Sequence, residues 1–310
     1  MADKVSILVL CGPTATGKTA LAAALARRLG GEVVGADSMQ VYRGLPIGTA
    51  APTAGEMDGV PHHLIGFLDP AQPFSVADYV RLASACVADI CARGRVPIVA
   101  GGTGLYLSSL VEGLRFAGEK AAPGLREELQ QRLAREGIAP LYAELQQIDP
   151  AYAATLHPNN HGRVLRALEL YRQTGRTMSW QLAHSRPAEH PYHALLYGLD
   201  FPQRSQLYAR INARVDAMMD AGLLEEARGV YAHRGAYRTA AQAIGYKEFF
   251  PYFEGAAPLE SCVEQLKQAT RRYAKRQLTW FRRMAGLRWE QAADPTAAER
   301  IAAAWREWHA

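Results

Sequence analysis

The stretch Gly12-Pro13-Thr14-Ala15-Thr16-Gly17-Lys18-Thr19 decides how the rest of this 310-residue sequence is interpreted. It follows the pattern G-x-x-x-x-G-K-[ST] of a phosphate-binding loop. The apolar residues 5–10 before it suit a buried parallel strand, and the Ala- and Leu-rich residues 20–29 after it suit a helix. Such a loop points backbone N–H groups at an anion, Lys18 adds a positive charge, and Thr19 offers a hydroxyl to Mg²⁺. These flanks make a chance match in a loop the weaker alternative.

Two further apolar runs end beside polar residues. Residues 33–36 predict a second strand that ends just before Asp37, and residues 97–100 predict a third that runs into a glycine turn containing Thr103. Ligands of open parallel sheets bind outside the carboxyl ends of the strands. We therefore expect both side chains to face the same crevice as the phosphate loop. An Asx turn at Asp37 and a helix cap at Thr103 are open alternatives.

The alternation of strands and helices predicts an α/β fold, a P-loop NTPase-like parallel sheet with flanking helices. It stops after residue 115 and resumes with a strand at 193–199, so residues 116–191 are predicted to be an all-helical insertion. We expect residues 1–115 to form the first part of the core, and residues 192–310 its return and the C-terminal helices. Residues 44–73 are rich in Gly and Pro and predict an irregular loop. Helices are predicted at 76–93, 125–136, 141–147, 162–174, 203–219 and 259–284, with one more in the tail from residue 292.

Composition limits the class of protein. Hydrophobic residues make up 49% of the chain, enough for substantial cores, but no apolar run reaches the length of about 18 residues needed to span a membrane. The cysteines Cys11, Cys86, Cys91 and Cys262 form no C-x-x-C pair, which argues against a zinc site or a disulfide framework. We expect a cytoplasmic protein that does not interact with membranes.

Positive charge is concentrated near the C-terminus. Residues 265–289 contain eight basic residues and no acidic one, although the net charge of the whole chain is only +5. Tyr273, Trp280 and Phe281 interleave with these bases, a combination that suits phosphate neutralisation and base stacking in nucleic-acid binding. A solvated basic helix is the alternative.

A phosphate loop usually predicts a kinase, but one expected part is missing. Neither residues 96–100 nor residues 195–199 end in the acidic residue of a Walker B strand. The loop is then expected to hold a diphosphate, with Mg²⁺ bound by Thr19, the diphosphate and water. A small-molecule kinase remains the alternative, although it leaves the basic stretch without a role.

Seven segments together carry a family resemblance. They are Gly12-Pro13-Thr14-Ala15-Thr16-Gly17-Lys18-Thr19, Ala36-Asp37-Ser38-Met39-Gln40-Val41-Tyr42, Ile47-Gly48-Thr49-Ala50, Gly101-Gly102-Thr103-Gly104-Leu105-Tyr106, Arg166-Ala167-Leu168-Glu169, Ile244-Gly245-Tyr246-Lys247-Glu248 and Ala274-Lys275-Arg276-Gln277-Leu278-Thr279-Trp280-Phe281-Arg282. In this order they resemble the bacterial type of the tRNA dimethylallyltransferase (tRNA isopentenyltransferase) family, over about residues 5–285.

The resemblance implies a prenyl transfer. The dimethylallyl group of dimethylallyl diphosphate would move to N6 of the adenosine immediately 3′ of the anticodon, in tRNAs that read codons beginning with U. It implies Mg²⁺ as cofactor and the anticodon stem-loop of tRNA as partner, and we expect a monomer. A related enzyme acting on free adenylate and a non-catalytic RNA-binding module are alternatives. The helical insertion and basic helix argue against the first, and the complete phosphate loop with Asp37 argues against the second.

The resemblance also implies roles for individual residues. Asp37 would be the general base and Thr103 would help to hold the flipped adenine. Residues of the phosphate loop would bind the diphosphate, with Thr14 at its bridging region and Arg214 as a clamp. The implied tRNA contacts are Asp37, Ser38, Met39, Gln40, Thr103, Arg126, His161, Gly162, Arg163, Val164, Leu165, Gln242, Ala243, Ile244, Gly245, Tyr246, Lys247, Lys275, Arg276, Gln277, Leu278, Thr279, Trp280, Phe281 and Arg282.

The chain departs from the family pattern at a few positions. Ala51 stands where the family often has Lys, Gly66 where it usually has Asp, and Asn160 where it usually has Asp. We expect the change at Asn160 to weaken a helix cap.

Overall fold

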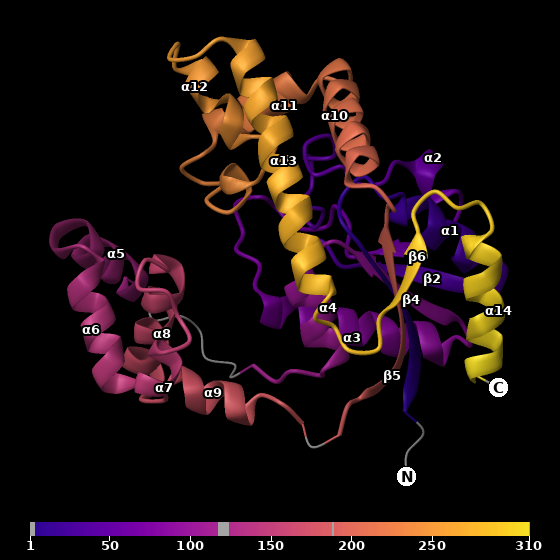
Figure 1. Ribbon diagram of the computed structural model, residues 1–310, viewed down its shortest axis with the longest axis horizontal. Helices are drawn as coiled ribbons and strands as arrows, with labels where there is room; N and C mark the ends of the chain where they lie inside the picture. The colour runs from indigo at the N-terminus through magenta and orange to yellow at the C-terminus, as the bar shows by residue number, and fades with distance from the viewer. Residues whose placement is uncertain (1–3, 117–123, 188, 310) are drawn as a thin grey trace. The chain divides into compact units, whose positions relative to one another are not determined.

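The computed structural model describes residues 4–116, 124–187 and 189–309, which fold as two units (Figure 1). Residues 1–112 and 190–310 make up the first unit, and residues 113–189 make up the second. We call them the core unit and the helical unit. Each has its own buried apolar cluster.

The core unit is built on a sheet of six strands with the order β3-β2-β4-β1-β5-β6. Every pair of neighbouring strands is parallel, and β1 lies between β4 and β5 with Leu10 opposite Ala100 and Tyr197. The prediction of a P-loop NTPase-like parallel sheet is confirmed. The strands are β1 (Val5–Cys11), β2 (Gly31–Gly35), β3 (His62–His63), β4 (Val96–Gly101), β5 (Tyr192–Asp200) and β6 (Arg288–Gln291).

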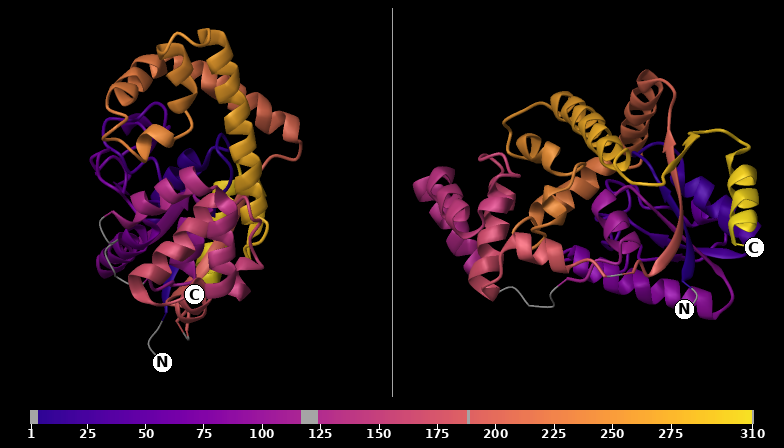
Figure 2. Two further views of the ribbon diagram at one scale, coloured as in Figure 1. Left: turned by 90° about the vertical axis from the view of Figure 1, so that its left-hand side faces the viewer. Right: turned by 60° about the horizontal axis from the view of Figure 1, so that its bottom comes forward.

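Alternate residues of β1 build the two apolar layers beside the sheet. Ile7 and Val9 pack on the face covered by α3 and α4, whereas Leu8 and Leu10 pack on the face covered by α1 and α14. Because side chains alternate along a strand, one continuous apolar run serves both layers. The C-terminal helix α14 lies beside α1, as Figure 1 and the right-hand view of Figure 2 show. These helices are α1 (Lys18–Leu29), α3 (Val76–Ala92), α4 (Gly104–Val111) and α14 (Ala297–His309).

A third apolar cluster joins the chain after β2 to the segment that follows β5. Val41 and Tyr42 pack there with Val215, Tyr246 and Leu266, which brings residues far apart in sequence together. The long helix α13 continues from this cluster toward the sheet (Figure 1). The helices of this region are α10 (Arg204–Asp220), α11 (Leu223–Ala232), η1 (Ala240–Gln242), η2 (Lys247–Phe249), α12 (Phe250–Phe253) and α13 (Leu259–Phe281).

The helical unit contains no strand within residues 124–187. Leu129, Leu141, Leu145 and Leu168 form its buried cluster, with apolar residues at helical spacing on each contributing helix. Asn160 occupies the N-cap of α8, and its side chain makes no capping hydrogen bond there. The helices are α5 (Leu125–Glu136), α6 (Ile138–Ile148), α7 (Pro150–Ala153), α8 (His161–Thr174) and α9 (Met178–His184).

The structure corrects the predicted edges of the sheet. The loop expected at residues 44–73 contains the helix α2 (Ala54–Met57) and the edge strand β3. The strand β6 was not predicted either, because Arg288 and Trp289 belong to the basic stretch and show no strand pattern. Strands of two and four residues are too short to show a hydrophobic period. Among the described residues, no helix is long and apolar enough to cross a membrane.

Candidate active site

The phosphate loop between β1 and α1 has the geometry of an anion cradle. Gly12 and Gly17 have φ angles of 145° and 83°. Residues with a Cβ atom rarely adopt such angles, whereas glycine adopts them readily. A Cβ atom at Gly12 would lie 2.7 Å from the carbonyl oxygen of Leu199, so β5 leaves no room for a side chain. The first turn of α1 contains no acidic residue, so nothing in that turn offsets the positive end of the helix dipole.

Lys18 is folded over this loop. Its Nζ donates a hydrogen bond of 2.6 Å to the carbonyl oxygen of Pro13. Burial, together with the nearby Arg214 guanidinium, lowers the pKa of Lys18 to about 8, although the Asp37 carboxylate acts in the opposite direction. An anion bound in the loop would raise the pKa of Lys18, because a nearby negative charge favours the protonated form.

Helix α10 supplies two more cations to the loop. Arg214 Nη1 donates to Thr14 Oγ1 at 3.2 Å, and Arg210 Nε donates to the Ala15 carbonyl oxygen at 3.2 Å. Burial lowers the pKa of Arg214, although Glu56 and Asp37 act in the opposite direction. The spacing of the two arginines places them on one face of the helix. Arg210 was not among the predicted site residues. Its position four residues before Arg214 was the only signal in the sequence that could have indicated it.

Asp37 lies two residues past the end of β2 and uses one carboxylate oxygen in a local turn. Its Oδ1 accepts hydrogen bonds from the backbone N–H groups of Met39 at 2.9 Å and Gln40 at 3.4 Å. The Asx turn that the sequence left open as an alternative at Asp37 is therefore present. The other oxygen, Oδ2, is directed toward Gly102, where a Cβ atom would be 3.6 Å away.

Thr103 joins the turn after β4 to the residue that follows Asp37. Its Oγ1 accepts a hydrogen bond from the Ser38 N–H at 3.0 Å and lies 3.4 Å from Ser38 Oγ. Thr103 occupies the N-cap of α4, yet its side chain makes no capping hydrogen bond. The capping alternative is thus not what the structure shows.

Helix α13 brings Tyr273 and Gln277 to the same place, one turn apart. Burial raises the pKa of the Tyr273 hydroxyl, the Asp37 carboxylate raises it further, and hydrogen bonding to Thr103 acts in the opposite direction. Gln277 is 5% exposed and bonds to both glycine loops. No sequence pattern indicated that Asp37 would be a neighbour of Tyr273.

The predicted tRNA contacts at residues 275–282 differ in exposure. The side chains of Gln277, Leu278 and Phe281 are buried. The exposed side chains are those of Lys275, Arg276, Thr279, Trp280 and Arg282.

Part of the basic stretch is paired inside the core unit. Lys267 lies 2.5 Å from Asp216, and Arg271 bonds to Asn212 at 2.7 Å and Glu264 at 2.9 Å. Lys267 and Arg271 therefore face acceptors on α10.

Other predicted tRNA contacts also differ in exposure. Gln242 and Lys247 are exposed, Ile244 is half-buried, and the residues Ala243, Gly245 and Tyr246 are buried. Residues 37–40 are half-buried at the end of β2. In the helical unit, His161, Gly162 and Arg163 are exposed, whereas Val164 and Leu165 belong to the apolar cluster. Arg126 pairs with the buried Glu169 at 3.5 Å.

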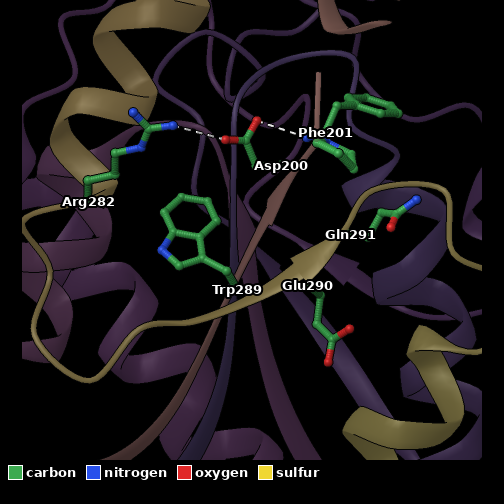
Figure 3. A pocket seen from close by; sticks show the side chains of 7 residues that line it. Asp200, Phe201, Arg282, Trp289, Glu290 and Gln291 are labelled. Atoms are coloured by element: carbon green, nitrogen blue, oxygen red, sulfur yellow. Dashed lines mark hydrogen bonds and ion pairs between the residues drawn. The ribbon is translucent and has the colours of Figure 1, made fainter. Parts of the chain in front are cut away.

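An acid does follow the neighbouring strand, contrary to the sequence-based expectation. Strand β5 extends to Asp200, beside an open hollow of about 320 Å³ that Arg282 and Trp289 also line (Figure 3). Asp200 accepts hydrogen bonds from the Phe201 N–H at 2.9 Å and from Arg282 Nη2 at 3.3 Å (Figure 3). Both carboxylate oxygens are thus engaged within the protein.

The described residues offer few ligands for a metal ion. They contain no group of three His, Cys, Asp or Glu side chains that could hold one. Thr19 stands in the first turn of α1 and offers one hydroxyl oxygen. This donor set fits an ion held mainly by the phosphate oxygens of a ligand.

Profiles of two protein families match this chain. The sequence profile of the family described as IPP transferase matches residues 40–284, and that of isopentenyl transferase matches residues 5–65. The tRNA dimethylallyltransferase of Geobacillus thermodenitrificans is 48% identical, over 93% of this chain and 91% of that protein. The one from Bacillus subtilis is 47% identical, over 96% and 94%.

Solved structures show the same similarity. The tRNA isopentenylpyrophosphate transferase of Bacillus halodurans is 43% identical with a TM-score of 0.73, covering 98% of this chain and 96% of that one. A eukaryotic dimethylallyltransferase, described as acting on tRNA, is 29% identical with a TM-score of 0.83, covering 98% and 79%. The chain belongs to the tRNA dimethylallyltransferase (IPP transferase) family.

Proposed function

We propose that this protein transfers the dimethylallyl group from dimethylallyl diphosphate to tRNA. The acceptor is N6 of the adenosine immediately 3′ of the anticodon, in tRNAs that read codons beginning with U. The observation that carries the proposal is the meeting of a cationic diphosphate cradle with a free carboxylate oxygen. Asp37 lies near enough to Lys18 and Arg214 to influence the pKa of both.

The cradle suits the departure of diphosphate. The C–O bond between the dimethylallyl carbon and the diphosphate breaks, and the bonding electrons leave on the phosphate oxygen. Lys18, Arg210, Arg214 and the N–H groups of the loop are arranged to stabilise that negative charge. Mg²⁺, with the Thr19 hydroxyl among its ligands, would supply further charge neutralisation when bound.

Asp37 suits the acceptor side of the reaction. The adenine N6 forms the new C–N bond and gains positive charge, because its lone pair becomes part of that bond. Asp37 Oδ2 accepts the N6 proton, while Oδ1 stays in the Asx turn that fixes the side chain. General bases of this kind contribute about 10²–10⁴-fold to the rate. We infer that Thr103 and Tyr273 line the adenine position, because both lie near this carboxylate.

The RNA partner accounts for the charge on α13. Lys275 and Arg276 are exposed on the helix whose buried face contacts the phosphate loop. We infer that they neutralise phosphates of the anticodon stem-loop, and that exposed residues of the helical unit such as Arg163 make further contacts. Extrusion of the adenine from the loop brings N6 to Asp37. We further propose that the protein acts as a monomer in the cytoplasm.

One assay tests the proposed function. The protein is incubated with unmodified tRNA, dimethylallyl diphosphate and Mg²⁺, and the digested nucleosides are analysed by mass spectrometry. We expect dimethylallyl-adenosine in the product, and its absence would contradict the proposal. A parallel reaction with ATP and small-molecule acceptors tests the kinase alternative, for which we expect no turnover.

A further inference from the structure

Gln277 is a buried polar side chain that joins two loops distant from it in sequence. Its Oε1 accepts a hydrogen bond of 3.0 Å from the Thr14 N–H in the phosphate loop. Its Nε2 donates a bond of 2.8 Å to the carbonyl oxygen of Gly102, in the turn that carries Thr103. The Gln277 amide thus pairs the Thr14 N–H of the phosphate loop and the Gly102 carbonyl of the glycine turn at the same time.

The glycine turn is shaped to receive α13. A Cβ atom at Gly102 would lie 2.4 Å from Gln277 Nε2, and one at Gly104 would lie 2.4 Å from the indole of Trp280. Trp280 Nε1 also donates to Ser108 Oγ at 3.0 Å. Gln277 and Trp280 are three residues apart and share a helix face. The absence of side chains at both glycines therefore lets this face of α13 seat directly on the turn.

The two loops joined by Gln277 belong to the two halves of the reaction. Thr14 lies in the diphosphate cradle and is also bonded to Arg214. Gly102 lies beside Asp37 Oδ2 and next to Thr103. The pairing of β1 with β4 places the two loops side by side as far as Cys11 and Gly101, and beyond that point the Gln277 amide ties one loop to the other.

We propose that Gln277 is a positioning residue that sets the separation between the diphosphate cradle and the Asp37–Thr103 side. This inference rests on the proposed function, and it replaces the role of tRNA contact that the family resemblance implies for Gln277. The adjacent Lys275 and Arg276 lie exposed on the same helix. Gln277 thereby also connects the proposed RNA surface to the loop that holds the leaving group.

The test is Gln277→Met, which keeps the length of the side chain and removes both hydrogen bonds. Gln268→Met, at an exposed position of the same helix, is the matched control. A misplacement of reacting groups by about 1 Å costs on the order of 10²-fold in rate, so we expect Gln277→Met to lower kcat by about that factor. The Kd values for the anticodon stem-loop and for inorganic diphosphate should each change by less than about 3-fold, since the groups that bind each of them stay in place.

Two results would overturn this role. An unchanged kcat would show that the two hydrogen bonds do not position the reacting groups. A large rise in the stem-loop Kd with kcat unchanged at saturating tRNA would return Gln277 to the class of RNA contacts. Failure of the wild-type protein to transfer a dimethylallyl group is a separate result, which would overturn the proposed function and this role with it.

A second variant covers the case in which Gln277→Met does not fold. Gln277→Asn keeps the amide but is too short to reach both loops. We expect it to retain the wild-type melting temperature within a few degrees and to lower kcat by about 10-fold or more. Wild-type kcat in a folded Gln277→Asn protein would contradict the positioning role.

Discussion

Asp37 uses one carboxylate oxygen in local structure and leaves the other for the proton transfer that we propose. Its Oδ1 accepts two backbone hydrogen bonds, while Oδ2 is directed toward Gly102 and the glycine turn. Asp69 provides a comparison, because its Oδ1 accepts from the Ala71 N–H at 2.8 Å in a similar turn on an exposed loop. A local Asx turn is thus predictable from sequence, whereas the environment of the second oxygen is not.

Asp37→Asn should separate these tasks. The asparagine can keep the turn with its Oδ1 but cannot accept the N6 proton, so we expect kcat to fall by about 10²–10⁴-fold. The melting temperature and the Kd for the stem-loop should stay close to the wild type. Asp69→Asn is the matched control, with unchanged kcat. Loss of a general base should lower kcat by at least about 10²-fold. If kcat of Asp37→Asn stays within about 2-fold of wild type, another group must accept the proton.

Lys18 should make diphosphate binding depend on pH. In the free protein its pKa is lowered to about 8, so its charge is present below that pH and is lost as pH rises through it. We expect the affinity for inorganic diphosphate to decrease as pH rises above about 8, because the cation that holds the ligand loses its proton. Titration calorimetry between neutral and alkaline pH measures this. Lys18→Gln is the control, because diphosphate itself still changes its protonation state with pH when this variant is titrated. If the pH dependence of Lys18→Gln equals that of wild type, Lys18 does not have this role.

Helix α13 has a buried face and an exposed basic face. One face seats Gln277 and Phe281 in the core unit, and the other exposes Lys275 and Arg276. The helical period predicted a basic amphipathic helix, and the structure bears this out over Leu259–Phe281. The period did not reveal that Lys267 and Arg271 are paired with α10, since their partners come from another element.

This division predicts different effects for equal changes in charge. Replacing Lys275 and Arg276 with Gln should weaken tRNA binding and flatten its dependence on salt, by about 0.7–0.9 in the log–log slope for each phosphate that is no longer neutralised. Replacing Lys267 and Arg271 with Gln removes the same charge from the same helix. That slope should then stay nearly unchanged, because those side chains are paired with residues of α10. Filter binding over a range of salt concentrations measures both. Equal slopes for the two double variants would show that only net charge matters.

The whole molecule consists of two units with separate apolar cores. Leu145, 1% exposed, lies in the cluster of the helical unit, and the phosphate loop lies wholly in the core unit. Packing within each unit is what stabilises it, so a defect in one core should stay local.

Leu145→Ala should therefore destabilise the helical unit by about 2–5 kcal/mol through the cavity it leaves. Hydrogen exchange should show reduced protection in α5, α6 and α8, with little change in β1, β4 and β5. Binding of inorganic diphosphate should be retained, while tRNA affinity falls. Leu182→Ala, at a position that is 53% exposed, is the control and should change neither. Protection reduced equally throughout both units would contradict their independence.

The sequence by itself determined the features that depend on neighbours along the chain. The strand, glycine loop and helix around Lys18 follow from local conformational preference, and the Asx turn of Asp37 uses N–H groups two and three residues away. The helices Leu125–Glu136 and Leu259–Phe281 follow from apolar periodicity within each segment. Such features need no information about distant residues.

Only the tertiary structure decided which distant residues meet. Gln277 is separated from Thr14 by 263 positions and from Gly102 by 175, so no periodicity relates them. The short strands β3 and β6 also owe their conformation to the neighbouring strands with which they pair. In each case a backbone group or side chain is satisfied by a partner that folding brings near, and that partner is invisible in the local sequence.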